Sequence, residues 1–390
     1  MVCPLRALPS ACYSYDMSKP AALIIGSSEK DSDLFYATKF IAPDPFIFVE
    51  IRNKKYLLAN DLEIDRAKKQ AAVHAVVSTS VLSKAYRAKF KKAAPLEEKL
   101  FWFLKKHRVK SLIIPADFPV RYYEPLKRAG FRIRYKNPPF YEKRSIKNRY
   151  EIAAIKQALR ATEYAVAKAI QVLKKSVIKK NRLYYKSKLL TSEFLKTIIH
   201  QSLLEKSCIG EHTIVSCGQQ TIDPHHRGSG PLYAHQPIIM DVFPRHEQTL
   251  YYADFTRTVV RGKASPVLKR MYAAVKEGQK IAFQMIRARM DGKKVHAAIQ
   301  ERFSQSGFQT GNMGGRMQGF FHSTGHGLGL DIHEPPRIGA ATDLLKAGQV
   351  VTVEPGLYYK GIGGVRLEDV VLVTKKGCTN LTKFPKFLEL

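Results

Sequence analysis

Four acidic residues in the C-terminal half of the chain stand inside runs of apolar and β-branched residues. Asp241 follows Pro-Ile-Ile-Met, Asp254 lies in Tyr-Tyr-Ala-Asp-Phe-Thr, Glu354 closes Val-Val-Thr-Val-Glu, and Glu368 lies in Gly-Val-Arg-Leu-Glu. Such runs are typical of buried β-strands, so we expect all four carboxylates on apolar strands. An isolated ionised carboxylate is expensive to bury. Any fold of this chain must therefore bring the four acids next to compensating positive charge.

Two divalent cations would supply that compensation, because four carboxylates carry four negative charges. His326, as a neutral imidazole, would complete the ligand set, with a water molecule as the nucleophile. A mixed carboxylate and imidazole set without thiolate suits Mn²⁺, Co²⁺, Fe²⁺ or Zn²⁺, and we expect Mn²⁺ first. For each acid taken singly, a structural ion pair is the alternative, since Arg257 and Arg366 stand close by in the sequence.

Three histidines, His322, His326 and His333, fall in one glycine-rich segment, Phe-His-Ser-Thr-Gly-His-Gly-Leu-Gly-Leu-Asp-Ile-His-Glu-Pro-Pro. Glycines at this density make a poor helix, so His322 and His326 do not form the i, i+4 zinc pair of a helical metalloprotease. We expect a loop that approaches ligands closely. Lone core histidines do not cluster in this way, which favours a functional role.

Two domains are expected from the order of the sequence patterns. Apolar runs alternate with helical patterns from residue 21 to about 134, which predicts a small α/β domain. Lys-Asn-Pro-Pro at 136–139 and the polar segment 142–148 mark the boundary, so the expected domains are residues 17–140 and 148–390. The second domain is predicted to be α+β with a largely antiparallel sheet. Its expected helices lie at residues 152–170, 191–206, 266–288 and 295–306, and its strands at 237–242, 251–260, 350–354 and 365–373.

The composition excludes several other classes. The formal net charge is +32, but the basic residues are dispersed over both halves without a recognition motif, so we expect no specific nucleic-acid partner. No apolar run approaches the ~20 residues of a membrane-spanning helix, so no membrane partner is expected. Five scattered cysteines fit reduced thiols and a cytoplasmic location. Met17, just before the first strand-like run, is an alternative translation start.

The motifs resemble the creatinase/methionine-aminopeptidase family with its pita-bread fold, and within it the Xaa-Pro aminopeptidases and prolidases. The resemblance rests on the five ligand positions in order, on Thr256-Arg257-Thr258 and on Glu354-Pro355-Gly356. In the N-terminal half, the segments 32–36 and 62–67 look like the family's N-terminal domain, which has a ribonuclease-H-like α/β shape without that activity. The resemblance implies metal-dependent hydrolysis of peptide bonds that precede proline, by an aminopeptidase or a dipeptidase, and we expect a homodimer.

The resemblance also implies a role for each ligand. Asp254 and Glu368 would bridge the two metal ions, Asp241 would hold one ion, and His326 with Glu354 would hold the other. Glu354 would in addition accept the proton of the attacking water and pass it to the leaving nitrogen.

Further residues are implied to contact the substrate. His225 and His333 would steady the tetrahedral intermediate, and His322 would recognise the proline, whereas His226 is expected to be a bystander. Arg366 and Glu368 are two positions apart on a predicted strand, so they should share a face, where the arginine can orient a carboxylate or contact the substrate. A plain structural ion pair is the other interpretation of Arg366.

The chain departs from the family pattern at one place. Phe243 replaces a glycine that usually follows the first ligand, and Asp241 and Asp254 are thirteen positions apart, a longer separation than is usual. The extra residues within 244–248 fit a surface turn between strands.

Three other functions are alternatives to the hydrolysis of Xaa-Pro bonds. A methionine aminopeptidase uses the same ligands but is normally a single catalytic domain without His322. A creatine-type amidinohydrolase shares the two-domain plan, but its metal-free site would not need these acids. A catalytically inactive scaffold that binds protein or nucleic acid would be expected to have lost ligands, and this chain retains all five.

Overall fold

The computed structural model describes residues 19–390 and divides the chain into two compact units between Tyr141 and Glu142. The alternative start at Met17, like Cys3 and Cys12, lies outside the described residues. Each unit has a hydrophobic core of its own. No helix in the described range is long and apolar enough to cross a membrane.

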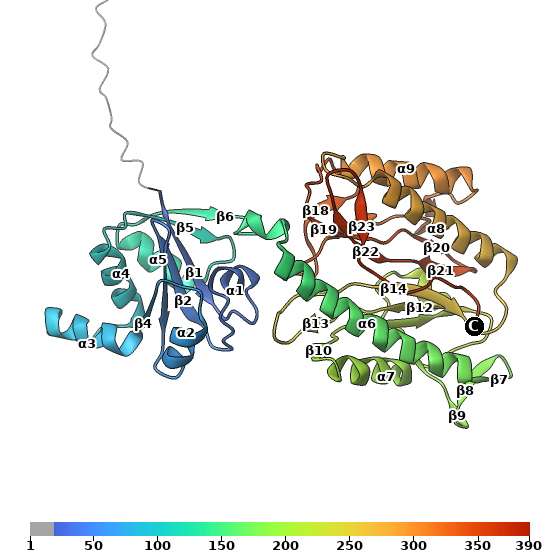
Figure 1. The fold of residues 1–390 in the computed structure, drawn as a ribbon, viewed down its shortest axis with the longest axis horizontal. Coiled ribbons are helices and arrows are strands. Elements are labelled where there is room, and N and C mark those ends of the chain that lie inside the picture. The colour runs from blue at the N-terminus through green and yellow to red at the C-terminus, as the bar shows by residue number, and fades with distance from the viewer. Residues whose placement is uncertain (1–18) are drawn as a thin grey trace, which may run out of the picture. The chain divides into compact units, whose positions relative to one another are not determined.

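The first unit is built on a six-stranded mixed sheet with the order β4-β3-β2-β1-β5-β6 (Figure 1). The pairs β1–β2 and β2–β3 are antiparallel, and the other pairs are parallel. The strands are β1 (Ala21–Gly26), β2 (Phe46–Ile51), β3 (Lys54–Ala59), β4 (Ala75–Ser78), β5 (Ser111–Pro115) and β6 (Arg132–Lys136). The helices are α1 (Ser32–Thr38), α2 (Ile64–Gln70), α3 (Thr79–Phe90), α4 (Leu96–Lys106) and α5 (Val120–Arg128).

The alternation of side chains along β1 explains why helices cover both faces of this sheet. Leu23 and Ile25 join a core with residues of α4 and α5, whereas Ile24 joins a second core with Leu34 of α1. Successive strand residues point to opposite faces, so a strand that is apolar at every position must be covered twice. The α/β domain predicted for this half is confirmed.

Helix α6 (Arg149–Lys175) opens the regular structure of the second unit. The side chain of Asn148 accepts the amides of Tyr150 and Glu151, while the Glu151 side chain accepts the amide of Asn148. This capping box satisfies amide groups that a helix start leaves unpaired. The predicted amphipathic stripe is buried along the helix, at Ile155, Leu159, Val166, Ala169 and Ile170.

Two helix pairs surround the strands of the second unit. Helix α6 packs against α7, which also contacts β11, and α8 packs against α9 and contacts β21 (Figure 1). The remaining helices are η1 (Glu142–Ser145), α7 (Ser192–Leu204), η2 (Gly218–Ile222), α8 (Pro266–Met285) and α9 (Gly292–Gln305).

The sheets of this unit carry the candidate ligands, and their strand pairs are antiparallel throughout the described residues, as predicted. The two larger sheets have the orders β11-β12-β14 and β18-β17-β19-β22-β23. Their strands are β11 (Ile214–Cys217), β12 (Pro237–Asp241), β14 (Thr256–Val260), β17 (Gly325–Gly327), β18 (Glu334–Ile338), β19 (Val350–Val353), β22 (Asp369–Val373) and β23 (Cys378–Asn380). The smaller sheets contain β7 (Val177–Lys179), β8 (Arg182–Tyr185), β9 (Lys188–Leu189), β10 (Cys208–Ile209), β13 (Arg245–His246), β15 (Gly311–Met313), β16 (Arg316–Gln318), β20 (Gly356–Tyr359) and β21 (Gly363–Arg366).

Two predicted strands differ from the structure. The strand expected at 251–260 begins only at Thr256, and the strand expected at 365–373 is divided into β21 and β22, with Leu367 and Glu368 between them. The chain passes here from pairing with β20 to pairing with β19. Asp254 and Glu368 therefore lie in short irregular segments beside strands, because an apolar run does not reveal where its pairing partner ends.

Candidate metal centre

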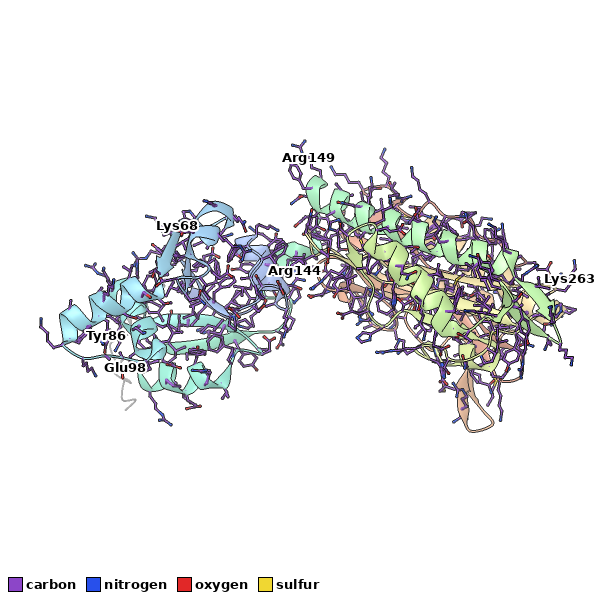
Figure 2. The ribbon with its side chains drawn as sticks, turned by 90° about the horizontal axis from the view of Figure 1, so that it is seen from below. Lys68, Tyr86, Glu98, Arg144, Arg149 and Lys263 are labelled. Atoms are coloured by element: carbon purple, nitrogen blue, oxygen red, sulfur yellow. The ribbon has the colours of Figure 1, made fainter. Side chains whose placement is uncertain are left out.

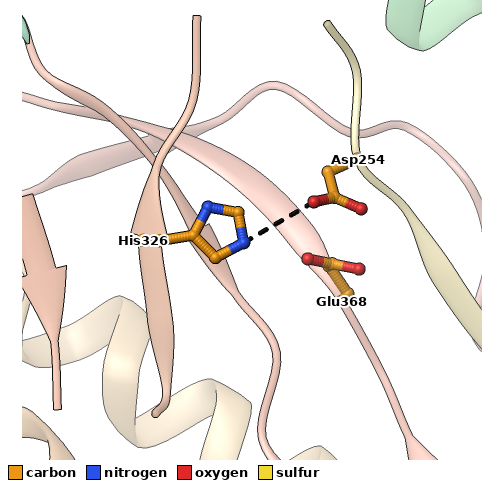
Figure 3. Close-up of side chains that lie close together, drawn as sticks. All are labelled: Asp254, His326 and Glu368. Carbon is orange, nitrogen blue, oxygen red and sulfur yellow. Dashed lines mark ion pairs between the residues drawn. The ribbon is translucent and has the colours of Figure 1, made fainter. Parts of the chain in front are cut away.

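Asp254, His326 and Glu368 converge from distant parts of the chain (Figure 3). Asp254 precedes β14, His326 is the central residue of β17, and Glu368 joins β21 to β22. One possible ligand atom from each lies within 4.8 Å of the others, and all three side chains are buried. Within residues 19–390, no other three His, Cys, Asp or Glu side chains meet in this way.

Asp241 and Glu354 line the same pocket as this cluster. Asp241 ends β12; its Oδ2 accepts a hydrogen bond from Arg366 Nη2 at 2.6 Å, whereas its Oδ1 is buried without a hydrogen-bond partner. Glu354 follows β19, and its Oε1 lies 3.3 Å from His326 Nε2. Buried polar atoms nearly always have partners, so the lone oxygen of Asp241 indicates a place for a ligand.

The hydrogen bonds of His326 fix which ring nitrogen faces the carboxylates. Nδ1 lies 3.1 Å from the carbonyl oxygen of Gly327, so in the neutral ring Nδ1 carries the proton. Nε2 then directs a lone pair toward Asp254 Oδ2 at 3.6 Å and Glu354 Oε1 at 3.3 Å. Lone pairs that face one another repel unless a proton or a cation lies between them. The donor set of carboxylate oxygens and a neutral imidazole fits divalent metal ions.

Burial shifts the pKa values of these groups strongly. It raises the pKa of Asp254 well above its usual value, with a further contribution from Asp241, and that of Glu368, with a further contribution from Asp254. The pKa of Glu354 is raised to about 7, also mainly by burial. Burial, together with His333, lowers the pKa of His326 to about 3. Without a cation, the site thus favours protons on Asp254, Glu354 and Glu368 and none on Nε2 of its imidazole.

A second layer of polar contacts fixes the ligand backbone. Arg257 is 1% exposed; its Nη1 donates to the carbonyl oxygen of Glu368 at 2.7 Å and its Nη2 to Asp369 Oδ1 at 2.8 Å. Gln279 of α8 donates to the carbonyl oxygens of Val353 and Leu367, the residues that precede the ligands Glu354 and Glu368. Arg257 therefore does not neutralise the four ligand carboxylates, since its charge is paired with Asp369.

The ligands lie in a pocket of about 800 Å³. His225, His322 and His333 also line it, so the three histidines expected to contact the substrate share one cavity with the candidate metal ligands. The ring of His333 packs edge-on against that of His326, with centroids 4.4 Å apart. His226 is absent from the lining, and its Nδ1 accepts the amide of Gly228, which agrees with a bystander.

His322 has both ring nitrogens engaged. Nδ1 lies 2.8 Å from the carbonyl oxygen of Ser323, and Nε2 lies 3.0 Å from the hydroxyl of Tyr358. The hydroxyl of Tyr358 also accepts a hydrogen bond from Arg366 Nη1 at 2.9 Å. A chain of polar contacts thus runs from Asp241 through Arg366 and Tyr358 to His322. His322 can offer a substrate its ring face and edge rather than a free N–H group.

Three local expectations from the sequence are wrong. His326 lies on the short strand β17 rather than in a loop. Arg366 and Glu368 do not share a strand, since β21 ends at Arg366, and the arginine forms the buried ion pair with Asp241. The residues at 244–248 are not all a surface turn, because Arg245 and His246 form β13, which pairs with β10, and His246 is 2% exposed.

Sequence analysis missed several residues of the site. Tyr358, Thr352 and Thr256 hold ligands or pocket residues in place, and the Thr256 hydroxyl donates to Glu368 Oε2 at 2.7 Å. Arg337 and Phe321 line the pocket. The sequence could have indicated Thr352 and Thr256, because each stands two residues from a candidate ligand. No local pattern in the sequence indicated Arg337.

The sequence of the chain is similar to those of known metallopeptidases. The profile of metallopeptidase family M24 matches residues 153–375. An Xaa-Pro dipeptidase of Pyrococcus horikoshii is 29% identical over 279 residues, which cover 70% of this chain and 74% of the relative. An Xaa-Pro dipeptidase of Pyrococcus furiosus is 31% identical over 242 residues, or 62% of this chain and 64% of the relative.

Solved structures show the same fold over nearly the full length. The prolidase from Pyrococcus horikoshii OT3 superposes with a TM-score of 0.76 at 26% identity and covers 95% of each chain. The X-Pro aminopeptidase from Thermotoga maritima MSB8 superposes with a TM-score of 0.79 at 23% identity, over 95% of this chain and 97% of its own. The expected fold, an α/β N-terminal domain followed by a pita-bread domain, is confirmed, as is the resemblance inferred from the motifs.

The raised carboxyl pKa values predict how the stability of the metal-free protein changes with pH. Above about pH 7.5, histidines are mostly neutral in both the folded and the unfolded chain, and unfolded Asp and Glu carry no protons. Folded Asp254 and Glu368, whose pKa values are raised well above the usual range, still retain protons there, so the folded state binds more protons than the unfolded state. The free energy of unfolding should therefore fall between about pH 7.5 and 9, by up to about 1.4 kcal/mol per pH unit for each retained proton.

Urea unfolding of chelator-treated protein at several pH values measures this slope. Protein reloaded with Mn²⁺ should lose the slope, because the cation replaces the protons. A metal-free stability that stays level or rises over this range would contradict the prediction.

Proposed function

The chain belongs to metallopeptidase family M24, and from this premise we propose that it hydrolyses peptide bonds that precede proline. The observation that carries the proposal is the buried cluster of Asp254, His326 and Glu368 beside the unpaired oxygen of Asp241, in a pocket lined by three further histidines. The Xaa-Pro dipeptidases and prolidases among its relatives support the choice of proline. The N-terminal residues 17–140 and the catalytic residues 148–390 would act as separate domains.

Two divalent ions, Mn²⁺ first and Co²⁺, Fe²⁺ or Zn²⁺ as alternatives, would be held by five side chains: Asp241, Asp254, His326, Glu354 and Glu368. When bound, such ions lower the pKa of water and polarise a carbonyl oxygen. The carboxylates supply the negative charge that retains the ions, and Arg366 and Thr256 hold two of those carboxylates in fixed orientations. Burial lowers the pKa of His326 to about 3 and so keeps its imidazole neutral, and the contact of Nδ1 with Gly327 leaves Nε2 with the free lone pair.

Glu354 is the proposed carrier of the proton. Its carboxylate lies in the pocket beside His326 and would accept a proton from the attacking water and return that proton to the leaving nitrogen. His225 and His333 line the same cavity and would donate hydrogen bonds to the oxygen of the tetrahedral intermediate. Arg366 would act indirectly, since its contacts with Asp241 and Tyr358 orient groups that face the substrate.

Proline would be recognised by shape at the His322 side of the pocket. The amide nitrogen of an Xaa-Pro bond carries no hydrogen, so a subsite that depends on that N–H cannot serve it. Phe321 and His322 line the pocket with their rings edge-on to each other, and the buried ring of Tyr358 packs behind both, so the two lining rings form an aromatic surface that suits a pyrrolidine ring.

Localisation and assembly belong to the same proposal. Cys208, Cys217 and Cys378 are free, and burial raises the pKa of the Cys208 and Cys217 thiols to about 11, which fits a reducing cytoplasm. We propose a homodimer without a specific nucleic-acid partner. An inactive scaffold and a methionine aminopeptidase remain the alternatives that the following measurements would reveal.

The first prediction concerns the metals. Wild-type enzyme with Mn²⁺ should cleave Ala-Pro, lose the activity with a chelator and regain it on adding metal. Glu368→Gln should reduce turnover to background and lower bound metal from two ions per chain toward one or none, because a bridging carboxylate is lost. Glu163→Gln, which changes another buried carboxylate that is paired with Arg160, should keep both activity and metal. Active wild-type enzyme without metal by elemental analysis would refute the proposal.

The second prediction concerns proline selectivity. His322→Ala should keep both metals but lower kcat/KM on Ala-Pro. The loss should correspond to about 1 to 3 kcal/mol of transition-state stabilisation, the range for apolar contacts in a pocket. His226→Ala should leave that value unchanged. Equal wild-type rates on Ala-Pro and Ala-Ala would discard the selectivity, and an unaltered His322→Ala rate would leave His322 with a structural role only.

The third prediction separates dipeptidase from aminopeptidase action. Arg337 lines the pocket, and its charge helps to lower the pKa of His333, so a guanidinium group close to the substrate site is available for the free carboxylate of a dipeptide. Arg337→Met should reduce kcat/KM on Ala-Pro by about 10- to 100-fold, since a hydrogen bond to a charged group is lost. The loss on Ala-Pro amide and longer Ala-Pro peptides should be small. Equal losses on all substrates would argue against carboxylate recognition.

A further inference from the structure

The loop 328–333 joins β17 to β18. It starts two residues after His326 and ends at His333, and the register pairs Gly327 with Glu334 at its base. Its backbone forms hydrogen bonds from Gly329 N to Asp331 O and from Leu328 N to Val350 O, and the carbonyl oxygen of Gly329 accepts the amide of Tyr252. Glycine-containing loops lose much conformational freedom on ordering, so the fixed place of His333 requires contacts from outside the loop.

The buried, positively charged side chains of Lys147 and Arg144 supply such contacts. Lys147 Nζ and Glu334 Oε1 form a buried ion pair, with side chains 1% and 3% exposed. Arg144 Nη2 lies 3.2 Å from Glu334 Oε2 and 2.6 Å from Asp331 Oδ2. Ion pairs therefore hold the loop at Asp331, two residues before His333, and at Glu334, one residue after it.

The segment that carries the cations is itself anchored within the second unit. Arg144 lies just before α6, whose first residue is Arg149 (Figure 2). The amide of Lys147 donates to the carbonyl oxygen of Gly348, and Ile146 forms a bridge with Gln349. Asn148 caps α6. Both cations thus project from a backbone that is fixed to the sheet next to the loop.

The carboxylate of Glu334 also needs space beside the loop. A Cβ atom at Gly329 would lie 2.7 Å from Glu334 Oε1 and 2.9 Å from Oε2, so a glycine at this position admits the carboxylate. Glu334 is consequently enclosed between the backbone of the loop and the two cations. Replacing a buried ion pair by apolar residues is often neutral or stabilising, so stability alone does not account for two buried cations here.

We propose that Arg144 and Lys147 are positioning residues that hold the loop 328–333 through Glu334 and Asp331 and thereby orient His333 toward the substrate. The inference rests on the proposed function in that His333 contacts the substrate. None of these four residues ligates a metal in the proposed site, and their effect on catalysis passes through His333.

Hydrogen exchange of the metal-free protein tests the positioning without relying on activity. Glu334→Gln should accelerate exchange of the backbone amides of residues 328–333 relative to wild type, and Glu163→Gln should not. Unchanged exchange in this loop would overturn the proposal, whether or not the protein cleaves Xaa-Pro peptides.

A double-mutant cycle tests the link to His333. Glu334→Gln should retain both metals and lose about 10- to 100-fold in kcat/KM on Ala-Pro, as is usual for a partner that orients an active-site group. In a His333→Ala background the same change should cost less than about 3-fold, because its route of action is already gone. Losses that multiply in the double variant would overturn the proposal, and so would a loss restricted to the melting temperature.

Asp331→Asn provides the same tests should Glu334→Gln fail to fold, since the Asp331 side chain is 44% exposed. Arg144→Lys, which keeps the charge, should retain more activity than Arg144→Met. If wild-type enzyme does not cleave Ala-Pro, the proposed function fails by itself, and the exchange measurement still decides the positioning.

Discussion

Repulsion among buried carboxylates is the constraint on which the rest of this structure depends. Burial raises the pKa values of Asp254, Glu354 and Glu368, neighbouring carboxylates raise them further, and an oxygen of Asp241 remains without a partner. Folding has to hold these groups together against their own electrostatics. Protons can relieve the repulsion in the metal-free protein, and divalent cations can relieve it at neutral pH. A site that stores this much negative charge is thereby prepared to bind metal.

The architecture supplies the required rigidity from strand ends and from polar contacts behind them. The four carboxylates of the candidate metal centre lie at or beside the ends of β12, β14, β19 and β21, where the chain leaves one sheet for another. Arg257 and Gln279 bind the backbone at those exits. Because regular strands on either side limit the movement of each exit, side chains far apart in sequence keep their relative positions.

The same logic extends from the metal ligands to the substrate side of the pocket. One polar chain runs from Asp241 through Arg366 and Tyr358 to His322, so the group proposed to face proline is tied to a metal ligand. On the opposite side, buried cations reach the loop that carries His333. Both arrangements fix flexible or glycine-rich segments by charge-assisted contacts, which are stronger and more directional than neutral ones.

The sequence by itself determined the classes of structure and the chemistry. Periodicity fixed α6 and the alternating elements of the first unit, and acids within apolar runs identified the four carboxylates, because burying a charge requires a compensating partner wherever the fold places it. The tertiary structure decided what those patterns could not contain: where pairing of the strand near Glu368 ends, that Arg366 binds Asp241, and that Arg144, Lys147 and Arg337 approach the site. The contacts of Arg366, Arg144 and Lys147 join residues more than a hundred positions apart, and all of these features depend on three-dimensional packing, which local sequence patterns do not encode.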